Sequence, residues 1–298
     1  MLLIPLLSVA VAGASTPALV PPCQLPLPQG VAVEAAPLVR AACHEHRLWY
    51  GGFIDRDGRI AQIAVTEAEA TMLADDGLRA WQQVARYWRE SGMLGSAGQH
   101  PGAPSCLGAG SSPVEQALCR SFLLDTPWSA TFISWLMRRA GIADFPASAA
   151  HLDYIRVAHR GQGPYTLADP YQVRIRPGDL LCHLRGNVQA TDPASFAQAL
   201  AEGRTHGWQS HCDLVVASNP GGNRTVYAIG GNVLNAVTMR LLPVDERGAL
   251  AVPPAPAVQP ECSLAAPEYC NQNRRHWVAL LQLRLQPPAM LAAPPPNP

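Results

Sequence analysis

The chain has 298 residues, of which 48% are hydrophobic, enough for a sizeable core, while 29 prolines predict long irregular connections. Its 22 basic and 22 acidic residues balance, and Lys and Arg form no run, which argues against nucleic acid as a partner. The balanced charge favours a small or neutral substrate.

The first residues predict an export signal over residues 1–14. Met1 to Val11 is an apolar run, and Ala12-Gly13-Ala14 offers a small-residue cleavage site. The usual basic start is missing, because no Lys or Arg precedes Arg40. The alternatives are a membrane-tethering segment or a misassigned start, but the run is too short to span a bilayer. We therefore expect an exported protein, periplasmic or secreted, without a membrane span.

Eight cysteines, an even number in an exported chain, predict up to four disulfides formed in an oxidising compartment. The sequence leaves their connectivity open. Pairing neighbours along the chain gives Cys23–Cys43, Cys106–Cys119, Cys182–Cys212 and Cys262–Cys270.

Residues 15–65 are expected to form an irregular N-terminal region. It is rich in Pro and Ala up to about residue 45, and Asp55 to Gly58 then form a turn between two short strands. Residues 92–112 are rich in Gly, Ser and Pro and predict a surface loop that a disulfide closes. Residues 286–298 predict a disordered Pro/Ala tail.

The regular elements are expected in one domain over residues 66–285. The pattern predicts helices before strands, which indicates an α+β fold with an antiparallel sheet. Residues 151–159 suit either a helix or the start of a strand. The other predicted helices span 66–91, 114–124, 126–141 and 195–202, and the predicted strands span 180–184, 213–218, 225–229, 236–242 and 277–285.

The helix over residues 126–141 places a reactive type of side chain in its first turn. Thr126 suits the N-cap, Pro127 the first helical position, and Gly141 a left-handed end. Ser129 lies where free backbone N–H groups and the positive helix end favour a developing negative charge. With a histidine supplied from elsewhere, this is the arrangement of a covalent hydrolase. Large apolar residues recur on one face of the helix, which we expect to be buried: Trp128, Phe132, Trp135 and Leu136.

Four short blocks resemble the papain-like cell-wall amidases of the NlpC and CHAP type. In the same order as in that superfamily, they match its nucleophile helix, a Pro-Gly-Asp strand opening, the strand of the catalytic histidine and a following strand that ends in Gly-Gly-Asn. Among its branches the chain most resembles the bacterial domain-of-unknown-function family 2272, over about residues 80–285. The blocks are PWSATFISW (127–135), RPGDLL (176–181), HCDLVV (211–216) and IGGN (229–232).

The resemblance implies a papain-like core and a catalytic set of Ser129, His211 and Asn232. Ser129 stands where the amidases have cysteine, a departure that suits an oxidising compartment in which a catalytic thiolate would risk mispairing. His211 would be the general base and Asn232 the residue that orients its ring. Asp213 is the second candidate for that orienting role. It lies two residues from His211, so on a strand the two side chains share one face, and Asp213 is not expected to reach the ring edge. The resemblance also puts Cys182 and Cys212 on neighbouring strands.

Each of these residues also has a structural interpretation. Ser129 could satisfy the backbone at the helix start, His211 could face the core, and Asn232 could be a turn residue. Trp128, Trp208 and Gly231 are candidates for substrate binding. Trp208 suits a core position equally well.

Cys43-His44-Glu45-His46 packs metal-ligand types densely, but no established metal-binding spacing accompanies them. A solvated loop with one disulfide cysteine is the preferred interpretation, and no metal or cofactor is expected.

The sequence thus predicts an exported hydrolase that cleaves amide bonds of peptidoglycan stem peptides. Peptidoglycan or its fragments would be the partner. Two alternatives stay open: a serine esterase or acyltransferase, and an inactive cell-wall-binding module. The scissile bond and the oligomeric state stay undetermined.

Overall fold

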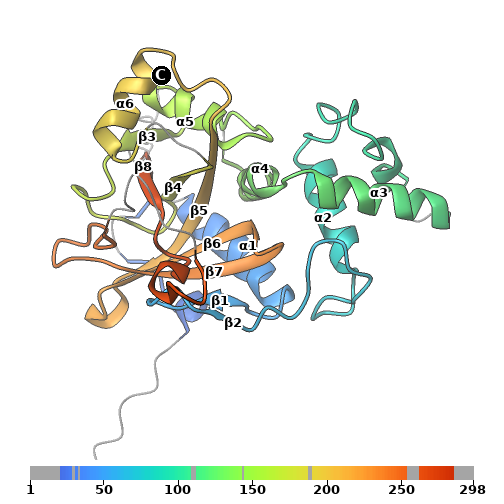
Figure 1. Cartoon of the computed structure of the whole chain (residues 1–298), viewed down its shortest axis with the longest axis horizontal. Coiled ribbons are helices and arrows are strands. Elements are labelled where there is room, and N and C mark those ends of the chain that lie inside the picture. Colours follow the sequence, from blue (N-terminus) through green and yellow to red (C-terminus); the bar gives the residue numbers. More distant parts are fainter. Residues whose placement is uncertain are drawn as a thin grey trace, which may run out of the picture.

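An eight-stranded sheet forms the centre of the protein (Figure 1). The computed structural model describes residues 21–28, 31–32, 34–108, 112–142, 144–186, 190–253 and 262–284. Neighbouring strands are antiparallel, except that β1 and β7 run parallel. The strands lie in the order β2-β1-β7-β6-β5-β4-β8-β3 and span Phe53–Ile54 (β1), Ile60–Ala61 (β2), Tyr165–Ala168 (β3), Leu180–Arg185 (β4), Gln209–Ser218 (β5), Thr225–Val233 (β6), Ala236–Pro243 (β7) and His276–Leu283 (β8).

The described part of the chain contains six α-helices. Helices α1 and α4 pack against β5 and β6, while α2 and α3 lie together at one side of the molecule, next to α4 (Figure 1). The α+β prediction is confirmed, with helices preceding most of the sheet. The helices span Ala35–Leu48 (α1), Ala80–Glu90 (α2), Pro113–Asp125 (α3), Ser129–Ala140 (α4), His151–His159 (α5) and Pro193–Ala201 (α6).

The strands from β4 to β8 are largely buried on both faces, and their side chains alternate between two apolar clusters. Along β5, Leu214 and Val216 belong to the larger cluster, which α1 and α4 complete, whereas Val215 belongs to the smaller one. Alternation along a strand puts these residues on opposite faces of the sheet. All five strands predicted from residue 180 onward form, and so do the two short strands on either side of the Asp55–Gly58 turn. For residues 151–159 the helical alternative is the observed one. The short strand β3 was not predicted.

Two predictions about the N-terminal third are wrong. The segment expected to be irregular contains α1, whose apolar side chains Leu38, Val39 and Ala42 recur at helical spacing and are buried. The helix expected from residue 66 begins only at Ala80. Asp75 closes a turn by accepting from the backbone N–H of Gly77, and Gln82 Oε1 accepts from the backbone N–H of Arg79 to cap α2.

The predicted disulfide pairing is confirmed at all four bonds. Cys182 and Cys212 face each other across β4 and β5. The other three bonds join Cys23 to Cys43, Cys106 to Cys119 and Cys262 to Cys270. All eight cysteines are thereby paired.

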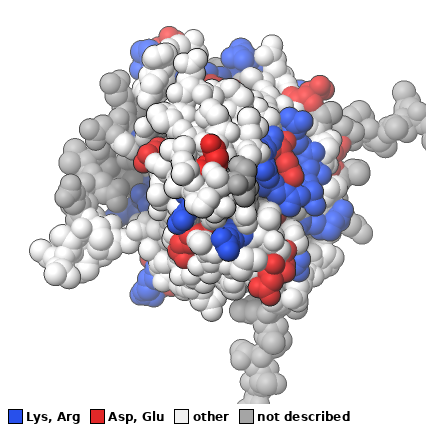
Figure 2. Space-filling view, turned by 90° about the vertical axis from the view of Figure 1, so that its right-hand side faces the viewer, with Lys and Arg blue, Asp and Glu red and all other residues white. Residues whose placement is uncertain are grey.

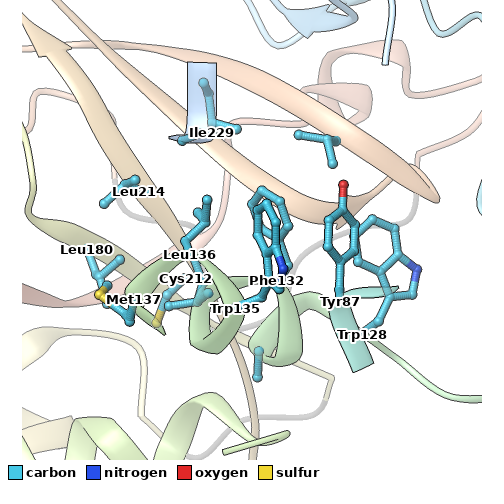
Figure 3. Close-up of a cluster of buried hydrophobic side chains, with 14 of the residues drawn as sticks. Tyr87, Trp128, Phe132, Trp135, Leu136, Met137, Leu180, Cys212, Leu214 and Ile229 are labelled. Carbon is cyan, nitrogen blue, oxygen red and sulfur yellow. The ribbon is translucent and has the colours of Figure 1, made fainter. Parts of the chain in front are cut away.

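Helix α4 contributes its predicted apolar face to the core. Figure 3 shows Trp128, Phe132 and Trp135 beside Tyr87 of α2, with Leu214 and Ile229 of the sheet in the same cluster. The Tyr87 ring lies 5.2 Å from that of Phe132 and 5.0 Å from that of Trp135. Burying each such side chain contributes about 1.5–3 kcal/mol, so this packing fixes the position of α4 on the sheet.

No helix in the described ranges combines the length and the apolar character that crossing a bilayer requires. The predicted export signal over residues 1–14 and the tail over 286–298 lie outside the described residues.

Candidate functional site

Helix α4 begins at Ser129, two residues after the predicted position of its first helical residue. Thr126 precedes Pro127, and the proline ring disfavours helical backbone at the residue before it. Thr126 is accordingly extended and ends α3, while Trp128 takes the N-cap position of α4. The predicted end is confirmed, since Gly141 is left-handed with φ 72°.

The Ser129 hydroxyl contacts a histidine that the sequence analysis did not select. Ser129 Oγ lies 2.7 Å from Nε2 of His151, the first residue of α5. On the other side of the ring, His151 Nδ1 contacts the hydroxyl of Tyr154. When Nδ1 carries the ring proton, it donates a hydrogen bond to the Tyr154 hydroxyl. Nε2 can then accept a hydrogen bond from Ser129. The pair therefore has the connectivity of a nucleophile, a base and an orienting group.

The Ser129–His151 pair is buried, with Ser129 5% and His151 4% exposed. Burial lowers the pKa of His151 well below 6.5, and the neighbouring His211 and Arg185 lower it further. The imidazole is therefore neutral near pH 7, which is the form that accepts a proton.

A second histidine pair lies on the sheet. His211 Nε2 donates to Asp213 Oδ1 at 2.7 Å, and Arg240 Nε donates to Asp213 Oδ2 at 3.2 Å. Although burial opposes it, the contacts with His211 and Arg240 hold the pKa of Asp213 well below its usual range. The other ring nitrogen, His211 Nδ1, accepts from Arg185 Nη2 at 3.3 Å.

The histidine rings of the two pairs lie next to each other, and a third histidine ring lies beside them. The ring of His151 lies 5.2 Å from that of His211, which lies 5.3 Å from that of His183. Ser129 and His211, both predicted site residues, are thus brought into one buried cluster, with His151 between them. The signal that could have found His151 is weak: a histidine three residues before a tyrosine in an element of uncertain type.

Asn232 has different partners from those expected. With its amide oriented to satisfy its neighbours, it donates to Glu67 Oε2 at 3.1 Å and accepts from the backbone N–H of Trp128 at 3.2 Å. Asn232 therefore supports the start of α4. Among the hydrogen bonds of the described residues, His211 is instead held by Asp213.

Asp213 reaches His211, although both lie on the same strand, because Gly230 leaves room for them. A Cβ at Gly230 would collide with Asp213 Oδ1 and His211 Nε2. The glycine thus permits a contact that two residues on one strand were not expected to make.

The three residues predicted to bind substrate occupy packing positions. Trp128 is fully buried and donates to Glu67 Oε2 at 3.1 Å. A Cβ at Gly231 would collide with Trp128 and Phe132, so the glycine allows β6 to approach α4. Trp208 stacks on Phe196 of α6 at 6.3 Å.

A cleft of about 930 Å³ lies beside the histidine cluster. Its walls come from the α3–α4 connection, the end of β4, the β6–β7 turn and the segment before β8. His183 opens onto it, and Pro127 and Asn232 bring it to the start of α4. The charged residues of the wall are Glu67, Asp125, Arg185, Arg240, Arg274 and Arg275.

The segment around Cys43 lies in α1 rather than in a solvated loop, so that interpretation is wrong, although its disulfide cysteine is confirmed. Glu45 accepts from Gln83 Nε2 at 2.8 Å, and His46 Nε2 contacts the backbone oxygen of Gly52 at 2.9 Å. Nowhere in the described ranges do three or more His, Cys, Asp or Glu side chains gather as metal ligands.

Residues 75–283 match the DUF2272 family, which is described as uncharacterized proteins conserved in bacteria. The chain belongs to this family. The predicted membership is thereby confirmed, and both histidine pairs lie within the DUF2272 region. No curated protein and no solved structure matches the chain.

Proposed function

We propose that this DUF2272 protein is a serine-dependent hydrolase with Ser129 as its nucleophile. The observation that carries the proposal is the 2.7 Å contact between Ser129 Oγ and His151 Nε2 at the first residue of α4. A serine hydroxyl is a weak nucleophile unless a base removes its proton during attack. The neutral His151 supplies such a base, and Tyr154 orients its ring.

The helix start supports the charge that attack would create. The first N–H groups of an α-helix have no acceptor within the helix, and its N-terminus carries partial positive charge. An acyl group attacked by Ser129 develops its negative charge beside these groups, which is the arrangement of an oxyanion site.

In this proposal His211 is a neighbour of the base rather than the direct partner of Ser129. Its ring lies 5.2 Å from that of His151, and Asp213 holds one of its nitrogens. The papain-like resemblance assigns the general-base role to His211, so the two histidines are the competing bases. Asp213 takes the orienting role that the resemblance gives to Asn232.

We propose amide bonds of peptidoglycan stem peptides as the substrate and the cell exterior as the compartment. The resemblance to cell-wall amidases supports the substrate. Four disulfides support an oxidising compartment. Serine in place of cysteine also favours esters, and this makes an esterase the second candidate.

The test is hydrolysis by purified full-length protein of peptidoglycan and of a series of acyl esters, with the products identified by mass spectrometry. We expect Ser129→Ala to abolish product release and Ser129→Cys to retain part of it. Ser121→Ala, an exposed serine of α3, is the matched control. Equal product release by the native and Ser129→Ala proteins would reject Ser129 as the nucleophile. Wall binding without any hydrolysis would favour the binding module.

A further inference from the structure

Four arginines from three separate segments meet on the wall of the cleft. Arg185 ends β4, Arg240 lies in β7, and Arg274 and Arg275 precede β8. The chain as a whole is neutral, so this local excess of positive charge is not a reflection of its composition.

Most of this positive charge has no carboxylate partner. Arg240 pairs with Asp213 at 3.2 Å, and this is the one salt bridge that any of the four arginines makes to a described carboxylate. Arg185 contacts the ring nitrogen of His211. Arg275 donates to Gln272 Oε1 at 2.6 Å, a neutral acceptor.

The arginines also act on one another. Burial, followed by the charges of Arg240 and Arg185, lowers the pKa of Arg275 to about 10. Burial and the charge of Arg240 lower the pKa of Arg185. Holding like charges together in a partly buried wall costs free energy, which an anion in the cleft would offset.

The carboxylates of the cleft do not cancel this charge. The wall carries two carboxylates, Glu67 and Asp125, against four arginines. Asp125 is exposed, and Glu67 accepts from Trp128 Nε1 at 3.1 Å. On the face that Figure 2 shows, by contrast, the largest group of basic side chains surrounds an acidic one. The cleft wall therefore holds more arginines than carboxylates.

We propose that this cleft binds a ligand that carries at least two carboxylate or phosphate groups. Arginine suits both, since its planar guanidinium donates two parallel hydrogen bonds to either oxyanion. The volume of about 930 Å³ accommodates a ligand much larger than a single inorganic ion. The cleft also reaches Pro127 and Asn232 at the start of α4.

This site has a consequence for the reaction, which rests on the proposed function. The substrate would be an acyl compound that carries several negative charges. Its acidic groups would bind the arginines while its acyl group lies near the helix start that carries Ser129.

The test is isothermal titration calorimetry of the full-length protein with citrate, tripolyphosphate, acetate and spermidine. We expect citrate and tripolyphosphate to bind at one site, more weakly as salt is raised, and acetate and spermidine to bind at least tenfold more weakly. The tighter of the two binders indicates whether carboxylate or phosphate is the preferred group. The Arg274→Gln/Arg275→Gln protein should lose at least tenfold in affinity, because it removes two guanidinium groups that donate charge-assisted hydrogen bonds to the anion.

Arg247→Gln is the matched control, since Arg247 is exposed and pairs with Asp245 outside the cleft. Arg274→Lys/Arg275→Lys, which keeps the charge but not the paired donors, should bind with intermediate affinity. Thermal unfolding confirms that each variant folds. Binding that is absent, or that is the same in the Arg274→Gln/Arg275→Gln and native proteins, overturns the proposal.

Repeating the titration with Ser129→Ala separates the two proposals. Anion binding should persist in that protein, since the hydroxyl is outside the cleft wall. Loss of anion binding in the arginine variants with no hydrolysis by native protein supports the site and rejects the enzyme. If the native protein hydrolyses substrate in a reaction that requires Ser129 but binds no anion, the enzyme is supported and the anion site is rejected.

Discussion

The two histidine pairs of the site are built differently. Ser129–His151 joins the first residues of two helices through neutral groups, whereas His211–Asp213 lies in one strand and is completed by the charge of Arg240. In the neutral pair the histidine is free to accept the serine proton as the serine attacks. An ionic set resists removal of any member, because the remaining charge stays buried without a partner. The first pair is therefore suited to chemistry and the second to holding the site together.

The largest expected effect comes from breaking the ionic pair. Asp213→Ala should reduce the free energy of unfolding by about 3–5 kcal/mol, because it leaves Arg240 buried without its carboxylate. Denaturant unfolding measures this loss. Asp153→Ala, which removes a partly exposed salt bridge to Arg156, should cost about 1 kcal/mol or less. Similar losses in the two variants would contradict the ionic role.

Breaking the neutral pair should affect turnover instead of stability. His151→Gln can still hydrogen-bond Ser129 but cannot take its proton, so the hydrolysis rate should fall about 10²–10⁴-fold with little change in unfolding. His159→Gln, at the other end of α5, is the control. If His211→Gln loses activity while His151→Gln keeps it, the base is His211.

The disulfide between β4 and β5 sharpens the comparison, because it lies beside the facing pair His183 and His211. Cys182→Ala/Cys212→Ala should lower the free energy of unfolding by about 2–4 kcal/mol. The comparison variant is Cys262→Ala/Cys270→Ala. Its disulfide joins cysteines with a sequence separation of 8, whereas Cys182 and Cys212 have a separation of 30, so its loss should cost about 1 kcal/mol less. An equal or larger loss at the shorter loop would refute this order.

The smallest effect is a shift in the pH profile. Since burial, His211 and Arg185 lower the pKa of His151, its neutral form should persist below pH 6.5, and activity should decline only at lower pH. Arg185→Gln removes one of these charges, raises the pKa of His151 and should move the acid limb upward by less than about one pH unit. Rates measured from pH 4 to 8 test this. If the acid limb of the Arg185→Gln protein stays in place, the charge of Arg185 does not lower the pKa of His151.

The sequence by itself determined much of the framework. Short apolar runs predicted the strands from β4 to β8, as expected where both faces of a sheet are buried. Neighbouring cysteines along the chain gave the disulfide pairing. Four short blocks identified the DUF2272 family, and Ser129 was recognised from its place at a helix start.

Only the tertiary structure decided which groups meet. His151 reaches Ser129 because α5 packs near the start of α4, and no local pattern encodes a contact across 22 residues. Asp213 reaches His211 because Gly230, on the next strand, leaves space. The balanced charge of the chain predicted a small or neutral substrate, yet folding gathers arginines from three segments into one cleft. Composition counts charges, whereas folding determines their separation, on which their interaction energy depends.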